Sequence, residues 1–287
     1  MTVEIAGRSV EVEANGLRHH VLQYGDESAP DLLILPGITS PAATADFLAV
    51  LLAEDGFRVH VPDIRGRGRT DTAPAGAYRL TDYAADVAAL VDALGLRQPT
   101  ILGHSMGARI ALAYAVLHAP DDHGLLLVVD PPVSGPDRGP YPTSREAFLE
   151  QLHEAQRGTT AAEIRRFYPR WPERELQLRA EVLASCDETA VLETHAGFES
   201  EDVFGYWREL RGPALLVRGG DSPVVPESAA EDLRQANPAI DIVTVPGAGH
   251  MVPWDNLPGF LDAARPYLQA AVTNAQPVSP SRPSIDR

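Results

Sequence analysis

Ser105 lies in a setting that could make its hydroxyl a nucleophile. It stands in GHSMG (residues 103–107), between an apolar run and an alanine-rich run that begins at Met106. A serine presented on a sharp turn from strand to helix needs small residues on both sides, and the two glycines of GHSMG supply them. The helix that follows would direct its free amides and positive dipole end toward the reacting centre. The pattern favours a catalytic serine over a small residue in a tight turn.

His250 is the histidine best placed to act as the base that Ser105 needs. A serine hydroxyl is a weak nucleophile until a base accepts its proton. The motif GAGHMVPWD (247–255) presents His250 in a glycine-rich loop directly after the last predicted strand, which is true of no other histidine in the chain. Because the sequence contains no His-Glu-x-x-His or comparable ligand spacing, we expect no metal ion.

The elements that must position these residues are predicted from hydrophobic periodicity. Short runs rich in valine, isoleucine and leucine, each ended by glycine, proline or aspartate, predict buried parallel strands. Segments with helical periodicity separate them, so we expect an α/β fold with an antiparallel hairpin, formed by 3–13 and 17–24, at the sheet edge. The predicted strands are 31–36, 57–62, 99–103, 124–129, 213–217 and 240–245, and the predicted helices are 42–55, 80–94, 106–118, 227–236 and 256–271.

Residues 134–207 interrupt this alternation. The stretch is poor in strand signals, opens in a proline- and glycine-rich segment and continues with helical patterns near 144–156, 160–168, 173–185 and 187–197. An insertion of this length between two strands is too long for a bare loop, so we expect a helical cap over the strand ends. The chain would then divide into a core formed by 1–133 and 208–272, the cap at 134–207, and a disordered tail at 273–287.

The composition of the chain indicates which classes of partner and which cellular location to expect. Of the 287 residues, 44% are apolar, which is enough for a substantial core. The formal net charge of −16 disfavours nucleic acid and anionic membranes as partners. We recognise neither a secretion signal nor a run of about 18 apolar residues, and therefore expect a cytoplasmic protein that acts on a small molecule. The single cysteine, Cys186, excludes an internal disulfide and is expected to be a buried apolar side chain.

Four motifs together resemble the α/β-hydrolase superfamily over residues 1 to about 272. They are LPGITS (35–40), DIRGRGRTD (63–71), GHSMG and GAGHMVPWD. The resemblance implies a mostly parallel eight-stranded sheet flanked by helices, with the helical cap inserted after the sixth strand, and no cofactor. It also implies that the backbone amides of Ile38 and Met106 form an oxyanion hole. Pro36 replaces the histidine usual before the first glycine of this loop, and the backbone donors are unaffected by that change.

The acid that would orient His250 has two candidates. Superfamily members usually carry it after the seventh strand in a Gly-x-x-Asp-x-x-Val-Pro frame, but here Ser222 occupies the acid position and Asp221 precedes it. The other placement known in the superfamily is the end of the sixth strand, where Asp130 stands at the carboxyl edge of the predicted sheet. We favour Asp130, and Asp221 is the alternative.

Within the superfamily, LPGITSP, DPPVSGP with its nearby PYP, and GDSPVV resemble the N-formylmaleamate deformylases. This resemblance implies a triad of Ser105, Asp130 and His250 that hydrolyses an N-formyl amide to formate and maleamate. The alternatives are an esterase or carbon–carbon bond hydrolase with the same triad, and a non-catalytic ligand-binding protein of this fold. A small acid substrate would need donors or a cation beside the serine, and the candidates are Thr39, Ser40, Tyr141, Arg145, Tyr168, His195 and Trp207.

Overall fold

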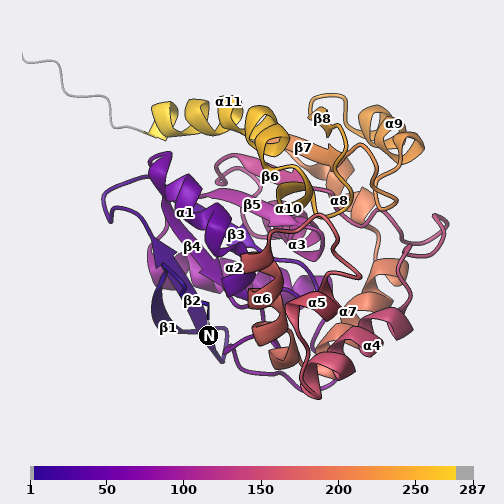
Figure 1. Cartoon of the computed structure of the whole chain (residues 1–287). Helices are drawn as coiled ribbons and strands as arrows, with labels where there is room; N and C mark the ends of the chain where they lie inside the picture. The colour runs from indigo at the N-terminus through magenta and orange to yellow at the C-terminus, as the bar shows by residue number, and fades with distance from the viewer. Residues whose placement is uncertain (1–2, 276–287) are drawn as a thin grey trace, which may run out of the picture.

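Eight strands form one mostly parallel sheet in the computed structural model, which describes residues 3–275 (Figure 1). The order across the sheet is β1-β2-β4-β3-β5-β6-β7-β8; β1 and β2 form an antiparallel hairpin at one edge, β2 runs antiparallel to β4, and the remaining pairs are parallel. The predicted fold class is confirmed. The strands are β1 Arg8–Ala14, β2 Leu17–Tyr24, β3 Asp31–Leu35, β4 Arg58–Pro62, β5 Thr100–His104, β6 Leu126–Val129, β7 Ala214–Gly219 and β8 Asp241–Val245.

Helices cover both faces of the sheet because successive strand residues point to opposite sides. In β3, Leu33 and Leu35 join the apolar cluster that contains α2 (Leu80–Leu94), α3 (Met106–Leu117) and α9 (Glu227–Ala236). Leu32 and Ile34 join the opposite cluster, which contains α1 (Asp46–Glu54), preceded by the short helix η1 (Ala42–Ala45), and α11 (Leu257–Ala275). A short helix, α10 (Val252–Asp255), precedes α11. None of the helices within residues 3–275 combines the length and apolar character that crossing a membrane requires.

The stretch between β6 and β7 is helical, and we refer to residues 134–207 as the cap segment. Its apolar side chains join the same cluster as α2 and α3. Side-chain caps fix three of its helix starts: Ser144 accepts a hydrogen bond from the Ala147 amide, Thr160 accepts one from the Glu163 amide, and Asp187 accepts one from the Ala190 amide. The helices are α4 Arg145–Gln156, α5 Ala161–Ile164, α6 Glu173–Val182, η2 Leu183–Ser185, α7 Glu188–Ser200 and α8 Val203–Glu209, the last of which crosses the expected boundary at 207.

The last helix extends into the first residues of the expected tail. Helix α11 continues to Ala275, so residues 273–275 are helical. Ala271 and Val272, near the end of this helix, still pack against the apolar cluster beneath it. The remaining residues of the expected tail, 276–287, lie outside the described part of the chain.

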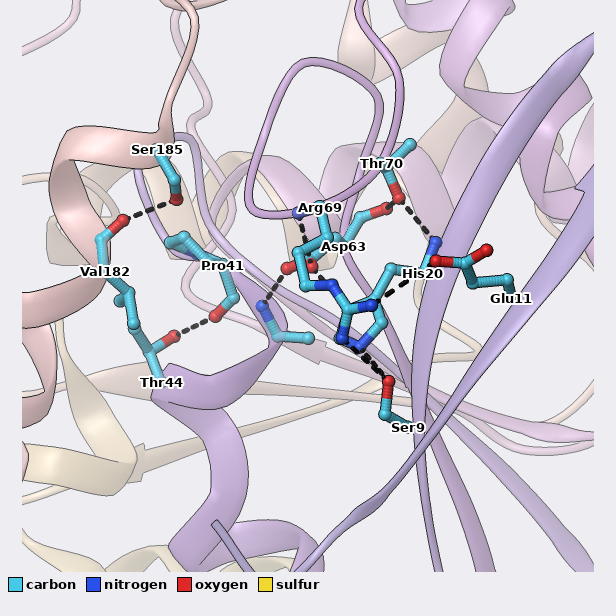
Figure 2. A network of polar contacts seen from close by, with 11 residues as sticks. Ser9, Glu11, His20, Pro41, Thr44, Asp63, Arg69, Thr70, Val182 and Ser185 are labelled. Atoms are coloured by element: carbon cyan, nitrogen blue, oxygen red, sulfur yellow. Dashed lines mark hydrogen bonds and ion pairs between the residues drawn. The ribbon is translucent and has the colours of Figure 1, made fainter. Parts of the chain in front are cut away.

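A buried polar network fixes the loop that follows β4 to the N-terminal hairpin (Figure 2). Asp63 accepts hydrogen bonds from the amides of Ala42 (2.6 Å) and Arg69 (2.9 Å), and its Oδ2 lies 2.7 Å from His20 Nδ1. His20 Nε2 lies 2.9 Å from Ser9 Oγ. Ser9, His20 and Asp63 thus form a Ser-His-Asp series that is separate from the predicted triad. Ser9 lies exposed on the edge strand β1, and the series connects the loop after β4 to the sheet.

Candidate active site

The backbone at Ser105 adopts a strained turn between β5 and α3. Ser105 has φ 55° and ψ −117°, a conformation that side-chain-bearing residues rarely adopt. The flanking glycines have no room for a side chain: a Cβ on Gly103 would lie 2.3 Å from the carbonyl oxygen of Gly107, and one on Gly107 would lie 1.9 Å from the carbonyl oxygen of Leu35. The first turn of α3 packs closely on Gly103, and β3 packs closely on Gly107, which explains both glycines of GHSMG.

The structure brings Ser105, His250 and Asp130 together from three distant parts of the chain. His250 Nε2 lies 2.9 Å from Ser105 Oγ, and His250 Nδ1 lies 2.8 Å from Asp130 Oδ2. Asp130 is 0% exposed and follows β6, whereas His250 lies in the loop after β8. Because the carboxylate can only accept at Nδ1, the imidazole holds its proton there and leaves Nε2 free to accept the serine proton.

Asp130, and not Asp221, contacts His250. The carboxylate of Asp130 also accepts hydrogen bonds from the amide of Gly219 (3.0 Å) and from Ser222 Oγ (2.5 Å), so β7 holds it in place. The side chain of Asp221 is 55% exposed and pairs with Arg170 at 3.3 Å. Ser222 fills the position that the acid usually occupies, and its hydroxyl supports Asp130, the acid of this chain. Sequence reasoning noted that substitution but assigned the residue no role.

Two backbone amides beside Ser105 are free to stabilise an oxyanion. Residues 37–40 form a turn in which the Ser40 amide donates to the carbonyl of Gly37 at 3.1 Å, with Ile38 at its centre. Among residues 3–275, neither the Ile38 amide nor the Met106 amide donates to a protein group. Met106 is the first residue of α3, where backbone amides have no helical partner.

A cavity of about 420 Å³ opens over these groups. Its volume lies within the usual range for small-molecule sites, roughly 300–1,000 Å³. Of the predicted substrate contacts, Thr39, Tyr141 and Tyr168 line it, together with Ile38, Ser105 and His250. The lining also includes Thr143, Gln151, Arg170 and Asp255, which sequence reasoning did not select.

Tyr141 reaches the reacting groups from the cap segment. Its hydroxyl lies 3.5 Å from His250 Nε2. Burial raises the pKa of the Tyr141 phenol, although a hydrogen bond with Ser105 opposes that shift. The phenol therefore keeps its proton at neutral pH and is available as a donor in the cavity.

The structure places two of the predicted substrate contacts in the cap segment away from the cavity. The side chain of Arg145 is 67% exposed and pairs with Glu146 on the surface at the start of α4. Trp207 is buried, and its indole Nε1 donates to the carbonyl of Leu233 at 2.9 Å, which anchors α8 to α9. Neither side chain lines the cavity, because surface pairing and core packing respectively hold them elsewhere.

Two further candidates support the cavity without lining it. His195 is buried against the ring of Tyr141, with its Nε2 donating to the carbonyl of Thr143 at 2.8 Å. Ser40 is buried at the end of the turn that contains Ile38. Neither residue is part of the cavity lining, and each supports a neighbour that is.

His104 holds the loop that carries His250. Its Nε2 donates to the backbone carbonyl of His250 at 2.9 Å. Complete burial, reinforced by the neighbouring His250, lowers the pKa of His104 to about 3. His104 is therefore neutral at ordinary pH and acts as a buried donor beneath the site.

Arg170 is the arginine that lines the cavity. It extends from the segment between α5 and α6, donates to the carbonyl of Gly247 and pairs with Asp221. The cap segment contains several other arginines, and no local sequence pattern distinguishes Arg170 from them.

Comparisons with known proteins agree with this fold. A family model described as alpha/beta hydrolase fold matches residues 30–257. The chain is 40% identical over 268 residues to the N-formylmaleamate deformylase of Pseudomonas putida, covering 93% of this chain and 98% of that enzyme. It is 31% identical over 235 residues to the 2-(acetamidomethylene)succinate hydrolase of Mesorhizobium japonicum, covering 78% of this chain and 83% of that enzyme.

A solved structure extends the likeness to three dimensions. The crystal structure of N-formylmaleamic acid deformylase from Pseudomonas putida S16 matches with a TM-score of 0.83 at 40% identity, covering 90% of this chain and 100% of that one. Family model, relatives and structural neighbour agree with the fold seen here, so the chain belongs to the α/β-hydrolase family and is a hydrolase.

Proposed function

We propose that this hydrolase cleaves the N-formyl amide of N-formylmaleamate and releases formate and maleamate. The observation that carries the proposal is the contact series from Ser105 through His250 to Asp130, at the base of a cavity of small-molecule size. The names of the two relatives supply the substrate class, since both denote small carboxylic acids that carry an acylated nitrogen.

In the first half of the proposed reaction, Ser105 Oγ attacks the formyl carbon while His250 Nε2 accepts the serine proton. Asp130 holds the other ring nitrogen protonated and stabilises the imidazolium that forms. The amides of Ile38 and Met106 bind the oxygen that becomes negative, a contact worth about 10²–10³ in rate for each donor.

Collapse of this intermediate breaks the carbon–nitrogen bond. His250 returns its proton to the departing nitrogen, so maleamate leaves and Ser105 retains the formyl group as an ester. The nitrogen lies between two carbonyl groups and departs more readily than an ordinary amine. A water molecule then gives a proton to His250 and attacks the formyl carbon. The bond to Ser105 Oγ breaks as His250 returns that proton to the serine oxygen, and formate is released.

Arg170 is the residue that we assign to the substrate carboxylate. Its guanidinium lies at the cavity lining and is 47% exposed, and its partner Asp221 is 55% exposed. A solvated ion pair of this kind contributes at most about 1 kcal/mol, so a substrate carboxylate can replace Asp221. Residues 134–207 would in this way act as a cap that supplies both Tyr141 and Arg170 to the substrate.

A substrate comparison tests the proposed function. We expect kcat/KM for N-formylmaleamate to exceed that for aryl esters and for N-acetyl analogues, because the added methyl group enlarges the acyl end that the oxyanion loop must hold. The rate is obtained by measuring the release of formate and maleamate by chromatography. A preference for the aryl ester would instead indicate an esterase with the same triad.

Arg170→Gln is expected to raise KM for N-formylmaleamate about 10-fold to 100-fold with little change in kcat. The variant loses a charge-assisted hydrogen bond to a group that does not react, and such a contact affects the ground state and the transition state equally. Steady-state kinetics of Arg170→Gln and of the matched control Arg170→Lys, which keeps the charge, give the comparison. An unchanged KM in Arg170→Gln would show that another group of the protein binds the substrate carboxylate.

A further inference from the structure

Two buried arginines hold the turn that carries the Ile38 amide. Arg67, from the loop after β4, donates through Nε to the carbonyl of Ile38 at 3.0 Å. Arg179, from helix α6 of the cap segment, donates through its two terminal nitrogens to the carbonyl and the hydroxyl of Thr39, each at 3.0 Å. The carbonyls of both central residues of the turn are therefore bonded by arginine.

Both arginines also connect this turn to the cap segment. Arg179 belongs to α6, and its guanidinium lies over the ring of Tyr168, 4.8 Å from the ring centre. Arg67 donates to the carbonyl of Ala190 at 3.2 Å and to the hydroxyl of Thr194 at 2.9 Å, both on α7. The position of the turn thus depends on the seating of two cap helices.

The charges of the two side chains are buried and face neutral oxygens. Arg67 is 0% exposed and Arg179 is 2% exposed. Their hydrogen bonds within the described residues go to carbonyl and hydroxyl oxygens, and none goes to a carboxylate. Burying an arginine without an acidic partner is costly, and an apolar side chain of similar size would avoid that cost.

We infer that Arg179, together with Arg67, is a positioning residue for the oxyanion hole. Their hydrogen bonds hold the turn so that the Ile38 amide faces the reacting carbonyl, and their positive charges, in a region of low dielectric, favour the negative charge that develops there. Because Arg179 comes from the cap segment, the oxyanion hole is complete only when the cap is seated. This inference rests on the proposed role of Ser105 but does not depend on the identity of the substrate.

Arg179→Met tests the inference, with Arg208→Met as the matched control. Arg208 is an arginine on α8, directly after the cap segment, that is 55% exposed and pairs with Asp202 on the surface. Two readouts are needed: kcat and KM for N-formylmaleamate, and the rate at which a fluorophosphonate labels Ser105. The label forms a charged phosphoryl intermediate at the same site and needs no natural substrate, so a wrong substrate assignment leaves this readout intact.

We expect Arg179→Met to lower kcat and the labelling rate about 100-fold while KM changes less than about 3-fold, as for loss of an oxyanion-hole donor. Arg179→Lys should recover part of the rate, since lysine can still bond one acceptor. Arg208→Met should behave as the unmodified protein, and melting temperatures report whether each variant is folded.

A milder pair of variants covers the case in which Arg179→Met does not fold. Thr39→Val removes the hydroxyl that Arg179 bonds and keeps the side-chain shape, so we expect labelling to slow about 10-fold. Thr39→Ser keeps the hydroxyl and should label faster than Thr39→Val. Labelling at the unmodified rate in folded Arg179→Met, or in Thr39→Val if the former is unfolded, would overturn the inference. A rise in KM with unchanged labelling would do so as well, because it would make Arg179 a substrate contact.

Discussion

Replacing Ser105 with alanine is expected to lower kcat for N-formylmaleamate by about 10⁶ and to leave the fold intact. The side chain that would form the ester is then absent, and His250 has no hydroxyl to deprotonate. Alanine and serine place the same Cβ on the strained backbone at φ 55°, so the turn itself should persist. Kinetics at high enzyme concentration, with a melting curve of the same sample, give both results.

Activity that survives in Ser105→Ala would contradict the assignment of the nucleophile. A trace of unmodified protein can imitate residual activity, and titration with a fluorophosphonate measures that trace directly. The matched control is Ser9→Ala, because Ser9 also lies within hydrogen-bonding distance of a histidine that contacts an aspartate. We expect Ser9→Ala to retain full activity.

Asp130→Asn is expected to lower kcat by about 10⁴ with a small change in KM, because it reverses the histidine tautomer. The Gly219 amide donates to Oδ1, so the oxygen of the new amide must occupy that position. The amide nitrogen then faces His250 and donates where the carboxylate accepted. The ring would have to move its proton to Nε2, which could no longer accept the proton of Ser105.

Asp221→Asn is the control for this result, since Asp221 was the alternative acid. Its carboxylate is exposed and pairs with Arg170. The variant loses only a solvated ion pair, and we expect kcat to change less than about 3-fold. A large loss in Asp221→Asn with little effect in Asp130→Asn would contradict the triad described above.

The fold could be predicted from the sequence because its strands and helices each have a recognisable local pattern of apolar residues. Buried parallel strands appear as short apolar runs, such as DLLIL, and the structure has β3 at Asp31–Leu35 as the pattern indicates. The site at the carboxyl ends of the strands could be anticipated for the same reason. Ser105 and Asp130 follow directly after β5 and β6, and His250 lies in the loop after β8. The carboxyl ends of parallel strands meet at one edge of the sheet.

The cap contacts could not be predicted, because no local pattern says which way a helix faces. Arg145 and Arg179 are both helical arginines near acidic residues, yet one is 67% exposed and the other is buried against the turn at Thr39. The difference arises from long-range packing of α6 on the core. The role of Ser222 could not be predicted for the same reason, since it depends on a contact with Asp130, which is far away in the sequence.

The most direct test of the account is to locate the residue that an active-site fluorophosphonate modifies. After reaction with the full chain, proteolysis and mass spectrometry should find one adduct, on the peptide that contains Ser105. The adduct should be lost in Ser105→Ala and form far more slowly in His250→Ala, because the hydroxyl then lacks its base. An adduct on another residue, such as Ser9, or labelling that proceeds equally well in His250→Ala, would contradict the claim that Ser105, His250 and Asp130 act as one catalytic unit.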